Sequence, residues 1–341
     1  MAGVVHVKKR LTNISLHYPQ DFDSLGEAFF PRVPAENLTD QFVSVNKANL
    51  LSLRELTPIG DDDLPPEVQI VYDADTSFSC QVYGVSSPGK WITSKNADPS
   101  LDYETERAIQ LTLSLRLRLE YLQVNQRLRS AALVTNNATL TAAQRFDNYT
   151  SATSLPVKTL QIICDNIKYK AGGKRRVNHI AMTTHVLRAI CRSEDFKDQV
   201  KFNAIQNAED LLKSGEGQVA VLAQLVGVSP SAFHIADHVY NAAAAGQAES
   251  YKAFIGSDIV VAYVEPLGLR SYSATAGFQW SAYDNNPSAI ISVPQYSRGI
   301  VPTEELRAFS VIDPKIIKTD LIYLLKGCVD TTDAAYGGLL D

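Results

Sequence analysis

The stretch AIQLTLSLRLRLEYLQVNQRLR, residues 108–129, decides the fold because its periodicity and its residue types indicate different elements. Polar residues alternate with leucines, as is typical of a strand, at Leu111, Leu113, Leu115, Leu117 and Leu119. The residue types, however, are mostly Leu, Arg, Gln and Glu, which are strong helix formers. Neither Gly nor Pro occurs between residues 100 and 155. We therefore predict a helix over residues 104–133, with a strand over residues 109–119 as the alternative.

The predicted helix is apolar on two sides and would be about 45 Å long at 1.5 Å per residue. One stripe comprises Leu111, Leu115, Leu119 and Leu122, and the second comprises Leu113, Leu117, Val124 and Leu128. Acidic residues precede it in DYETE, where they favour a helix start. A helix with two apolar stripes needs two packing partners.

Composition is that of a soluble globular protein. The 341 residues are 45% hydrophobic and 20% charged, which is enough for two domains or one large one. The net charge of -5 argues against general nucleic-acid affinity, because free-standing DNA binders carry a basic face. No CxxC spacing links Cys80, Cys164, Cys191 and Cys328, which suits a reducing compartment and argues against a disulfide framework.

Neither a secretory signal nor a membrane span is expected. The N-terminal run MAGVVHVKKR places its charges after a short apolar run, which is the wrong order for a signal. The longest uncharged window, residues 217–236, contains two Gln, two Gly and Pro230. This window is better interpreted as a buried helix, a turn and a strand than as a membrane span.

The N-terminal third lacks a segment that could form a core alone. Residues 1–60 scatter apolar residues among turn formers, and an acidic, turn-rich break follows at residues 57–67. Residues 68–84, VQIVYDADTSFSCQVYG, predict two strands of a hairpin with a turn at residues 73–75. A lone hairpin is marginally stable in water, so this one needs a surface to lie against.

The remaining elements predict the α+β class, because helices and strands mix without a βαβ rhythm. We expect helices within residues 154–172, 184–196 and 217–228, and strands within residues 174–183, 231–242 and 258–266. Residues 271–329 should form further strands or short helices.

Motifs for catalysis or phosphate binding are incomplete. In AGGKRR, residues 171–176, Lys174 precedes Arg175 instead of the Ser or Thr of a phosphate loop, so a helix end and a basic turn are favoured. Ser229 lacks the GxSxG context of hydrolases, and Cys191 with His185 has no recognisable signature. We therefore predict that the protein is not an enzyme.

Candidate metal ligands also have simpler interpretations. His234 and His238 could share a metal on a helix, but the alternation around them favours a strand, on which they lie too far apart. The run of Asp61, Asp62 and Asp63 could bind a cation, but a solvated acidic loop is favoured. No metal site and no cofactor are predicted.

What the sequence does contain is a set of extended parts that cannot be stable alone: an N-terminal arm, a hairpin and a long two-sided helix. Such parts become ordered by packing on neighbouring subunits. This combination is typical of an assembly protein.

The order of elements resembles the major capsid proteins of tailed bacteriophages, the Hong Kong ninety-seven type fold that encapsulins share. The resemblance covers about residues 103–329 and is clearest at residues 141–193. The matching positions are Phe146-Asp147, Ser154-Leu155-Pro156, Gly172, Asn178 and Val186-Leu187. Two positions depart from the pattern, since the family often has Trp where Phe146 stands and Pro where Val177 stands.

The resemblance implies a division of the chain into an N-terminal arm (1–50), an extended loop (51–97), a peripheral domain (98–160 and 290–341) and an axial domain (161–289). The helix over residues 104–133 would be the spine of the peripheral domain. One of its stripes would then pack on the domain's own sheet, and the other would meet an arm or an extended loop. Assembly contacts are expected at Asp61, Asp62, Asp63, Lys90, Trp91 and Lys95.

The implied function is a structural one: self-assembly as hexamers and pentamers into an icosahedral head around double-stranded DNA, made in the host bacterial cytoplasm and located in the virion. Scaffolding, portal and decoration proteins are the further partners that this family uses. Two alternatives remain at this point, an encapsulin-like compartment with protein cargo and a soluble α+β enzyme with an unrecognised site.

Overall fold

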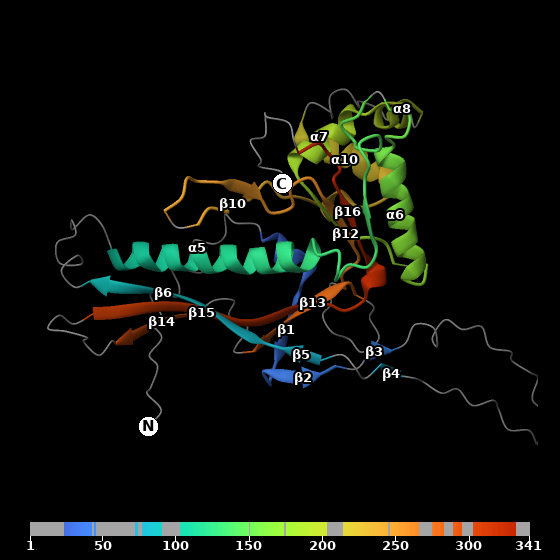
Figure 1. Cartoon of the computed structure of the whole chain (residues 1–341). Helices are drawn as coiled ribbons and strands as arrows, with labels where there is room; N and C mark the ends of the chain where they lie inside the picture. Colours follow the sequence, from blue (N-terminus) through green and yellow to red (C-terminus); the bar gives the residue numbers. More distant parts are fainter. Residues whose placement is uncertain are drawn as a thin grey trace, which may run out of the picture.

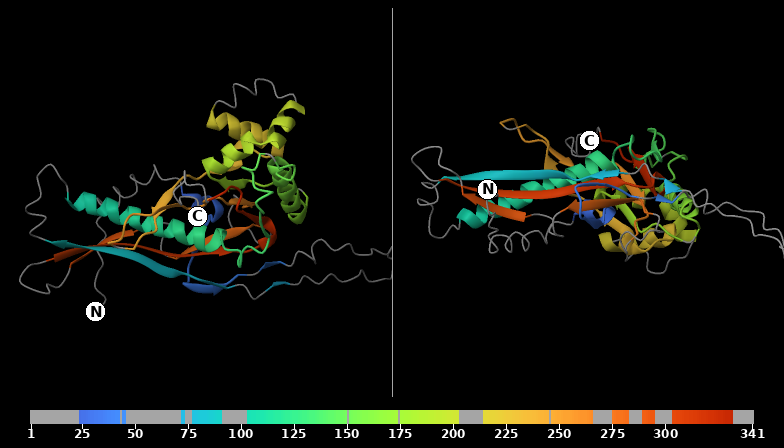
Figure 2. Two further views of the ribbon diagram at one scale, coloured as in Figure 1. Left: turned by 45° about the horizontal axis from the view of Figure 1, so that its top comes forward. Right: turned by 90° about the horizontal axis from the view of Figure 1, so that it is seen from below.

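The computed structural model describes residues 24–42, 44–45, 72–73, 77–90, 103–149, 151–173, 175–202, 214–244, 246–265, 275–282, 289–294 and 303–331. Within these ranges the chain is an α+β protein built around two five-stranded sheets (Figure 1). A long helix lies along one sheet, and a group of shorter helices surrounds the other, so the molecule is elongated (Figure 2).

The first sheet, here called the long sheet, has the strand order β1-β13-β15-β14, and β6 pairs with β15 as well. Its strands are β1 (Arg32–Ala35), β6 (Gln81–Lys90), β13 (Gly277–Ala282), β14 (Ala289–Pro294) and β15 (Thr303–Ile316). The 14-residue β15 is its axis, because it pairs antiparallel with β6, β13 and β14. Only β1 runs parallel to its neighbour, β13.

The helix predicted from the opening stretch is confirmed, and the strand alternative is wrong. Helix α5 (Tyr103–Gln123) lies along β6 and β15 (Figure 1). Its first stripe packs on the long sheet, where Leu111 and Leu115 meet Leu306 and Ala308. Its second stripe enters the main core, where Val124 and other residues join the cluster that contains Leu25 and Phe29. Two stripes therefore explain the alternation: one side faces the long sheet, and the other meets the main core through Leu117 and, in the turn that follows α5, Val124 and Leu128.

The end of this helix differs from the prediction. A π-helical turn, Val124–Leu128, follows α5 directly, and the chain leaves the helix at Arg129 instead of residue 133. The Arg129 N–H donates to the Val124 carbonyl five residues earlier (2.9 Å), which widens the last turn. Asn137 then closes the following turn, because its amide donates to the carbonyls of Val134 (2.7 Å) and Ala131 (3.2 Å).

The second sheet, here called the compact sheet, has the order β7-β16-β12-β8-β9. Its strands are β7 (Asn137–Thr139), β8 (His179–Met182), β9 (Phe233–Ile235), β12 (Ile259–Ala262) and β16 (Ile322–Lys326). All four residues of the central β12 are fully buried, as expected for a strand covered on both faces. The 3₁₀ turns Pro230–Ala232 and Thr319–Leu321 lead into β9 and β16.

Four helices gather around the compact sheet (Figure 1): α6 (Pro156–Lys170), α7 (Thr184–Arg192), α8 (Glu194–Phe202) and α10 (Gly215–Val226). Helix α6 begins at Pro156, as predicted, and ends before Gly172, whose φ of 87° is easily adopted only without a side chain. The predicted strand over residues 231–242 is two strands, because residues 236–238 interrupt it. The second, β10 (Val239–Asn241), pairs with β11 (Tyr251–Ala253).

The predicted hairpin within residues 68–84 pairs differently from the expectation. Strand β4 (Tyr72–Asp73) pairs with β3 (Ser44–Val45), and β5 (Ser77–Ser79) pairs with β2 (Thr39–Gln41). The two expected arms thus form a ribbon with an earlier segment, and β6 turns into the long sheet.

Sheet membership also crosses the boundaries expected between domains. Strand β16 belongs to the compact sheet with β7, whereas both had been grouped with the peripheral parts. Strand β13 belongs to the long sheet, although residues 161–289 were expected to form a separate domain. Part of the expected N-terminal arm is built into the body, since helix α2 (Leu25–Phe29) and β1 pack there. No helix in the described ranges is both long and apolar enough to cross a bilayer.

Candidate functional site at the junction of the two sheets

Most residues singled out as assembly contacts lie outside the described part of the chain. Asp61, Asp62, Asp63, Trp91 and Lys95 are among them. Lys90 is the last residue of β6, where its backbone pairs with Thr303 of β15. The structure does show what holds the ribbon on either side of residues 46–71, the range that includes the three aspartates.

An aromatic stack anchors the ribbon whose strands flank residues 46–71 in the sequence. Trp280 of β13 contacts two rings: Phe78 of β5, with centroids 5.0 Å apart, and Phe42 after β2, at 4.7 Å. Both contacts are stacked, with ring planes 4° and 28° apart. Phe78 and Trp280 are buried in one cluster with Phe278 and Val311. Trp280 therefore contacts both sides of the ribbon, and Asp313 and Lys315 of β15 add hydrogen bonds to the backbone of Ser79 and Ser77.

Helix α2 is inserted where the two sheets meet. The Ser24 hydroxyl donates to Glu120 of α5 (2.6 Å), and the Gly26 N–H donates to the same carboxyl group (3.0 Å). Glu120 is 2% exposed. Burial raises the pKa of the Glu120 carboxyl above its usual value, and these hydrogen bonds partly oppose that effect. Gly26 permits the contact, because a Cβ there would lie 1.9 Å from Oε1 of Gln123.

The other side of α2 rests on a pair of histidines. Nδ1 of His179 in β8 lies 2.8 Å from Nε2 of His234 in β9, and the two ring planes are 15° apart, as suits a hydrogen bond between ring nitrogens. Phe29 of α2 packs on both rings, with centroid distances of 5.5 Å to His179 and 6.2 Å to His234. Burial, and secondly the charge of His234, lower the pKa of His179 to about 4. His234, considered above as a metal ligand with His238, is thus used in a different pair.

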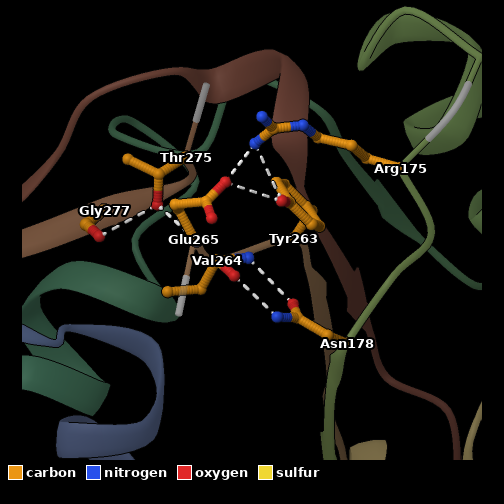
Figure 3. Close-up of polar contacts among 7 residues, drawn as sticks. All are labelled: Arg175, Asn178, Tyr263, Val264, Glu265, Thr275 and Gly277. Atoms are coloured by element: carbon orange, nitrogen blue, oxygen red, sulfur yellow. Dashed lines mark hydrogen bonds and ion pairs between the residues drawn. The ribbon is translucent and has the colours of Figure 1, made fainter. Parts of the chain in front are cut away.

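A polar network joins the strand ends where the chain passes from the compact sheet to the long sheet (Figure 3). The Arg175 guanidinium pairs with Glu265 and donates to the Tyr263 hydroxyl (2.9 Å), which itself donates to Glu265 (2.9 Å). The Glu265 N–H donates to the hydroxyl of Thr275 (3.2 Å). Because Glu265 and Thr275 flank residues 266–274, this network fixes both ends of that segment.

Asn178 continues the network toward β8 (Figure 3). Its side-chain amide makes two hydrogen bonds with the backbone of Val264: it accepts from the N–H (2.8 Å) and donates to the carbonyl (2.6 Å). The side chain thus replaces a backbone partner at the edge of the strand pairing. A role in the fold explains this residue fully.

A buried ion pair ties the end of the long helix to the compact sheet. The Nε of Arg129 lies 2.8 Å from Oδ2 of Asp258, and Asp258 also accepts from the Gly327 N–H (3.1 Å). The same guanidinium donates to the Phe254 carbonyl (3.2 Å). The Asp258 side chain is 5% exposed, so this charge depends on its partners.

The other candidate residues show no arrangement for catalysis. Burial raises the pKa of the Cys191 thiol to about 12, which is opposite to the shift that a nucleophilic cysteine needs. The Ser229 hydroxyl pairs with that of Ser231 (2.8 Å). In the described ranges no three His, Cys, Asp or Glu residues are grouped as a metal site would require.

No protein-family model and no curated protein sequence matches the chain. Solved structures do. A phage-related protein from Bordetella bronchiseptica RB50 matches 96% of this chain and 99% of its own, with a TM-score of 0.65 at 14% identity. The mature capsid of bacteriophage PhiM1 matches 89% of this chain and 87% of its own, with a TM-score of 0.52 at 12% identity. The chain has the Hong Kong ninety-seven type capsid fold. The capsid structure of cyanophage P-SCSP1u also matches, over 87% of this chain and 86% of its own (TM-score 0.50, 10% identity).

The residues that carried the resemblance occupy structural positions in this capsid fold. Phe146 is 1% exposed, and its N–H donates to the Cys328 carbonyl (2.8 Å). The Asp147 carboxylate accepts from the Asp330 N–H (2.6 Å). These contacts hold the segment before α6 against the chain that leaves β16.

Sequence reasoning missed the residues that organise the junction of this capsid fold: Glu120, His179 and Trp280. Glu120 resembled a surface residue on a charged helix face, and its partner Ser24 is 96 positions away. His179 and His234 are separated by 55 positions. Of the three, only Trp280 had a usable signal, since apolar and polar residues alternate in its segment GFQW, as in a strand, before turn-forming residues.

Proposed function

We propose that the protein is the major capsid protein of a tailed phage. In this proposal it self-assembles as hexamers and pentamers into an icosahedral head that encloses double-stranded DNA. The observation that carries the proposal is the fold, shared with a mature phage capsid over 89% of this chain. The net charge of -5 is consistent with a shell that contains DNA without binding its sequence.

Each part of the structure has a role in this proposal. The long sheet with α5 serves as the peripheral domain, and the compact sheet with its helices serves as the axial domain near the five-fold and six-fold axes. The ribbon held by Trp280 carries the extended loop toward an adjacent subunit, and the residues before Ser24 act as the N-terminal arm. Specific interfaces of this kind bury roughly 1,200–2,000 Å² each.

The acidic run Asp61, Asp62 and Asp63 is proposed to meet Lys or Arg of a neighbouring subunit, with Lys90, Trp91 and Lys95 at the same interface. Electrostatic complementarity of this kind sets register and partner choice more than strength. Replacing all three aspartates by lysine should therefore reduce the yield of closed shells. Shells of unchanged yield and diameter would refute this contact.

The first experiment is negative-stain electron microscopy of the sedimenting fraction after expression of the chain alone, with absorbance at 260 and 280 nm. Closed shells or capsomer rings support the assembly function. Co-expression with the scaffolding, portal and decoration proteins of the same phage then tests whether these partners change the yield and the diameter.

Two other outcomes contradict the proposal. Shells that enclose protein and exclude nucleic acid, also in infected cells, indicate a compartment of the encapsulin type. Small particles that stay small with the scaffolding protein and that convert a small molecule indicate an enzyme.

A further inference from the structure

The histidine pair joins three parts of the molecule at one contact. His179 belongs to β8, His234 belongs to β9, and the ring of Phe29 in α2 packs on both. Helix α2 is the first element of the chain that the structure describes. A change that separates these rings therefore also weakens the packing of α2 on the compact sheet.

The geometry of the pair limits how many protons it can carry. A ring-nitrogen distance of 2.8 Å requires an N–H on one ring and a lone pair on the other. A first added proton can bind at a nitrogen outside this contact and leave the hydrogen bond intact. A second proton must take the accepting lone pair, so two N–H groups on two cations then face each other. The contact therefore tolerates one positive charge but not two.

We propose that the pair His179–His234, with Phe29 packed on it, is an acid-sensitive latch that releases α2 from the compact sheet when both rings are protonated. The proposal concerns the folded chain itself, so it goes beyond the capsid function and can be tested separately from assembly. Within a shell, the same release would free the N-terminal segment from the junction of the two sheets.

The pKa of His179 sets the direction of the effect. The value is lowered to about 4, first by burial and then by the charge of His234, so the folded state favours the neutral ring. Such a group contributes stability that is fully present above its ordinary pKa of 6.5 and is lost as the pH falls through about 4. The latch should therefore hold at neutral pH and open in mild acid.

Other charged groups face α2 from the neighbouring elements. Glu27 of α2 pairs with Arg32 of β1 at the surface. On α5, Glu120 contacts the start of α2, and the pKa of Arg116 is lowered, mainly by its burial. On β12, the residue paired with His179 is the uncharged Ala262.

Glu120 titrates in the opposite sense to the histidines. Because burial raises its pKa, protonation in mild acid relieves the cost of a buried charge and favours the folded state. A pH profile of the wild-type chain alone thus contains both effects. The test must remove the histidines specifically.

Hydrogen–deuterium exchange measured by mass spectrometry on the full chain tests the latch at pH 7, 6, 5 and 4, with labelling times scaled for intrinsic exchange. The wild-type peptide covering residues 24–30 should lose protection by at least about tenfold, the factor equivalent to one pKa unit. A peptide covering β12 should stay protected. The double variant His179→Gln/His234→Gln should show no such loss, and the control variant His185→Gln on α7 should behave like wild type.

Several results would overturn the latch. These are unchanged wild-type protection of residues 24–30 down to pH 4, an equal loss in the double variant, or simultaneous loss in β12, which indicates global unfolding. A second measurement needs no variant: exchange of the histidine C2 hydrogens reports each ring's pKa in the wild-type chain. A pKa near 6.5 for both His179 and His234 would also overturn it.

Discussion

Trp280 and Phe78 lie face to face, with ring planes 4° apart and centroids 5.0 Å apart. Phe42 also stacks on this indole, with centroids 4.7 Å apart. Trp280 is part of a central strand of the long sheet, whereas its two partners are on the two sides of the ribbon that carries residues 46–71. A side chain of the rigid sheet therefore contacts both sides of the ribbon, and the Ser79 N–H adds a hydrogen bond to Asp313 of β15 (2.9 Å).

Replacing this indole should destabilise the chain and misdirect the ribbon. We expect Trp280→Ala to lower the free energy of unfolding by about 3–5 kcal/mol, since it leaves a large cavity where a buried indole contacted two rings. Trp280→Phe keeps a stacking ring and should cost less. Urea denaturation measures both variants, and electron microscopy compares their shell yields. An alanine variant within about 1 kcal/mol of wild type would show that the stack is not what holds the ribbon.

The buried ion pair at the end of the long helix gives a second prediction. Arg129→Ala leaves Asp258 buried without its cation and should cost about 3–5 kcal/mol in denaturation experiments. The matched control is Lys201→Ala, because Lys201 pairs with Asp198 at the surface, where both side chains are more than three-quarters exposed. That change should cost less than about 0.5 kcal/mol. Equal effects of the two substitutions would contradict the buried pair's importance.

A third prediction concerns the close approach of α2 and α5. A Cβ at position 26 would lie 1.9 Å from Oε1 and 2.8 Å from Cβ of Gln123, so Gly26→Ala should cost about 1–3 kcal/mol despite its better helix propensity. The cost should shrink in a Gln123→Ala background, which a double-mutant cycle measures.

The control for this cycle is Gly215→Ala at the start of α10, where an added Cβ meets nothing within 4 Å. It should leave stability unchanged or raise it by about 0.4–1 kcal/mol. If the cost of Gly26→Ala is the same with and without Gln123, the contact with Gln123 is not its cause.

The long helix could be predicted from sequence because its strongest signals are local. Leu, Arg and Glu favour a helix at every position, and no Gly or Pro interrupts it, so the alternation of leucines was outweighed. The π-helical turn had no such local signal, and Arg129, the residue that follows it, has its partner Asp258 129 positions later. Four adjacent apolar residues made the buried strand β12 predictable in the same local way.

The ribbon and the junction could not be predicted, because their partners are distant in sequence. Strand β2 has the sequence TDQ, which carries no period that would predict a pairing with β5. His179, His234 and Glu120 each acquire their environment only when α2 is in place. Spacing along the chain could therefore not identify them, although the order of elements predicted the fold around them.

The last prediction uses the buried Glu120 and compares wild type with Glu120→Gln. A glutamine of the same length can still accept from Ser24 or Gly26 but does not titrate. Because the pKa of Glu120 is raised in the folded chain, its ionisation costs stability as the pH rises through that value, and the penalty is absent below about 4.5. Wild type should therefore gain stability relative to Glu120→Gln as the pH falls from 7 to 4.5, and the histidine contribution cancels in this difference.

Glu120→Ala, which leaves the Gly26 N–H without its acceptor, should cost about 1–3 kcal/mol at pH 5. Urea denaturation of all three chains across this pH range is the measurement. The prediction is wrong if the difference in free energy of unfolding between wild type and Glu120→Gln does not change with pH, or if it favours the glutamine variant in acid. Glu120 would then titrate as an exposed carboxyl, and α2 would not pack on a buried charge.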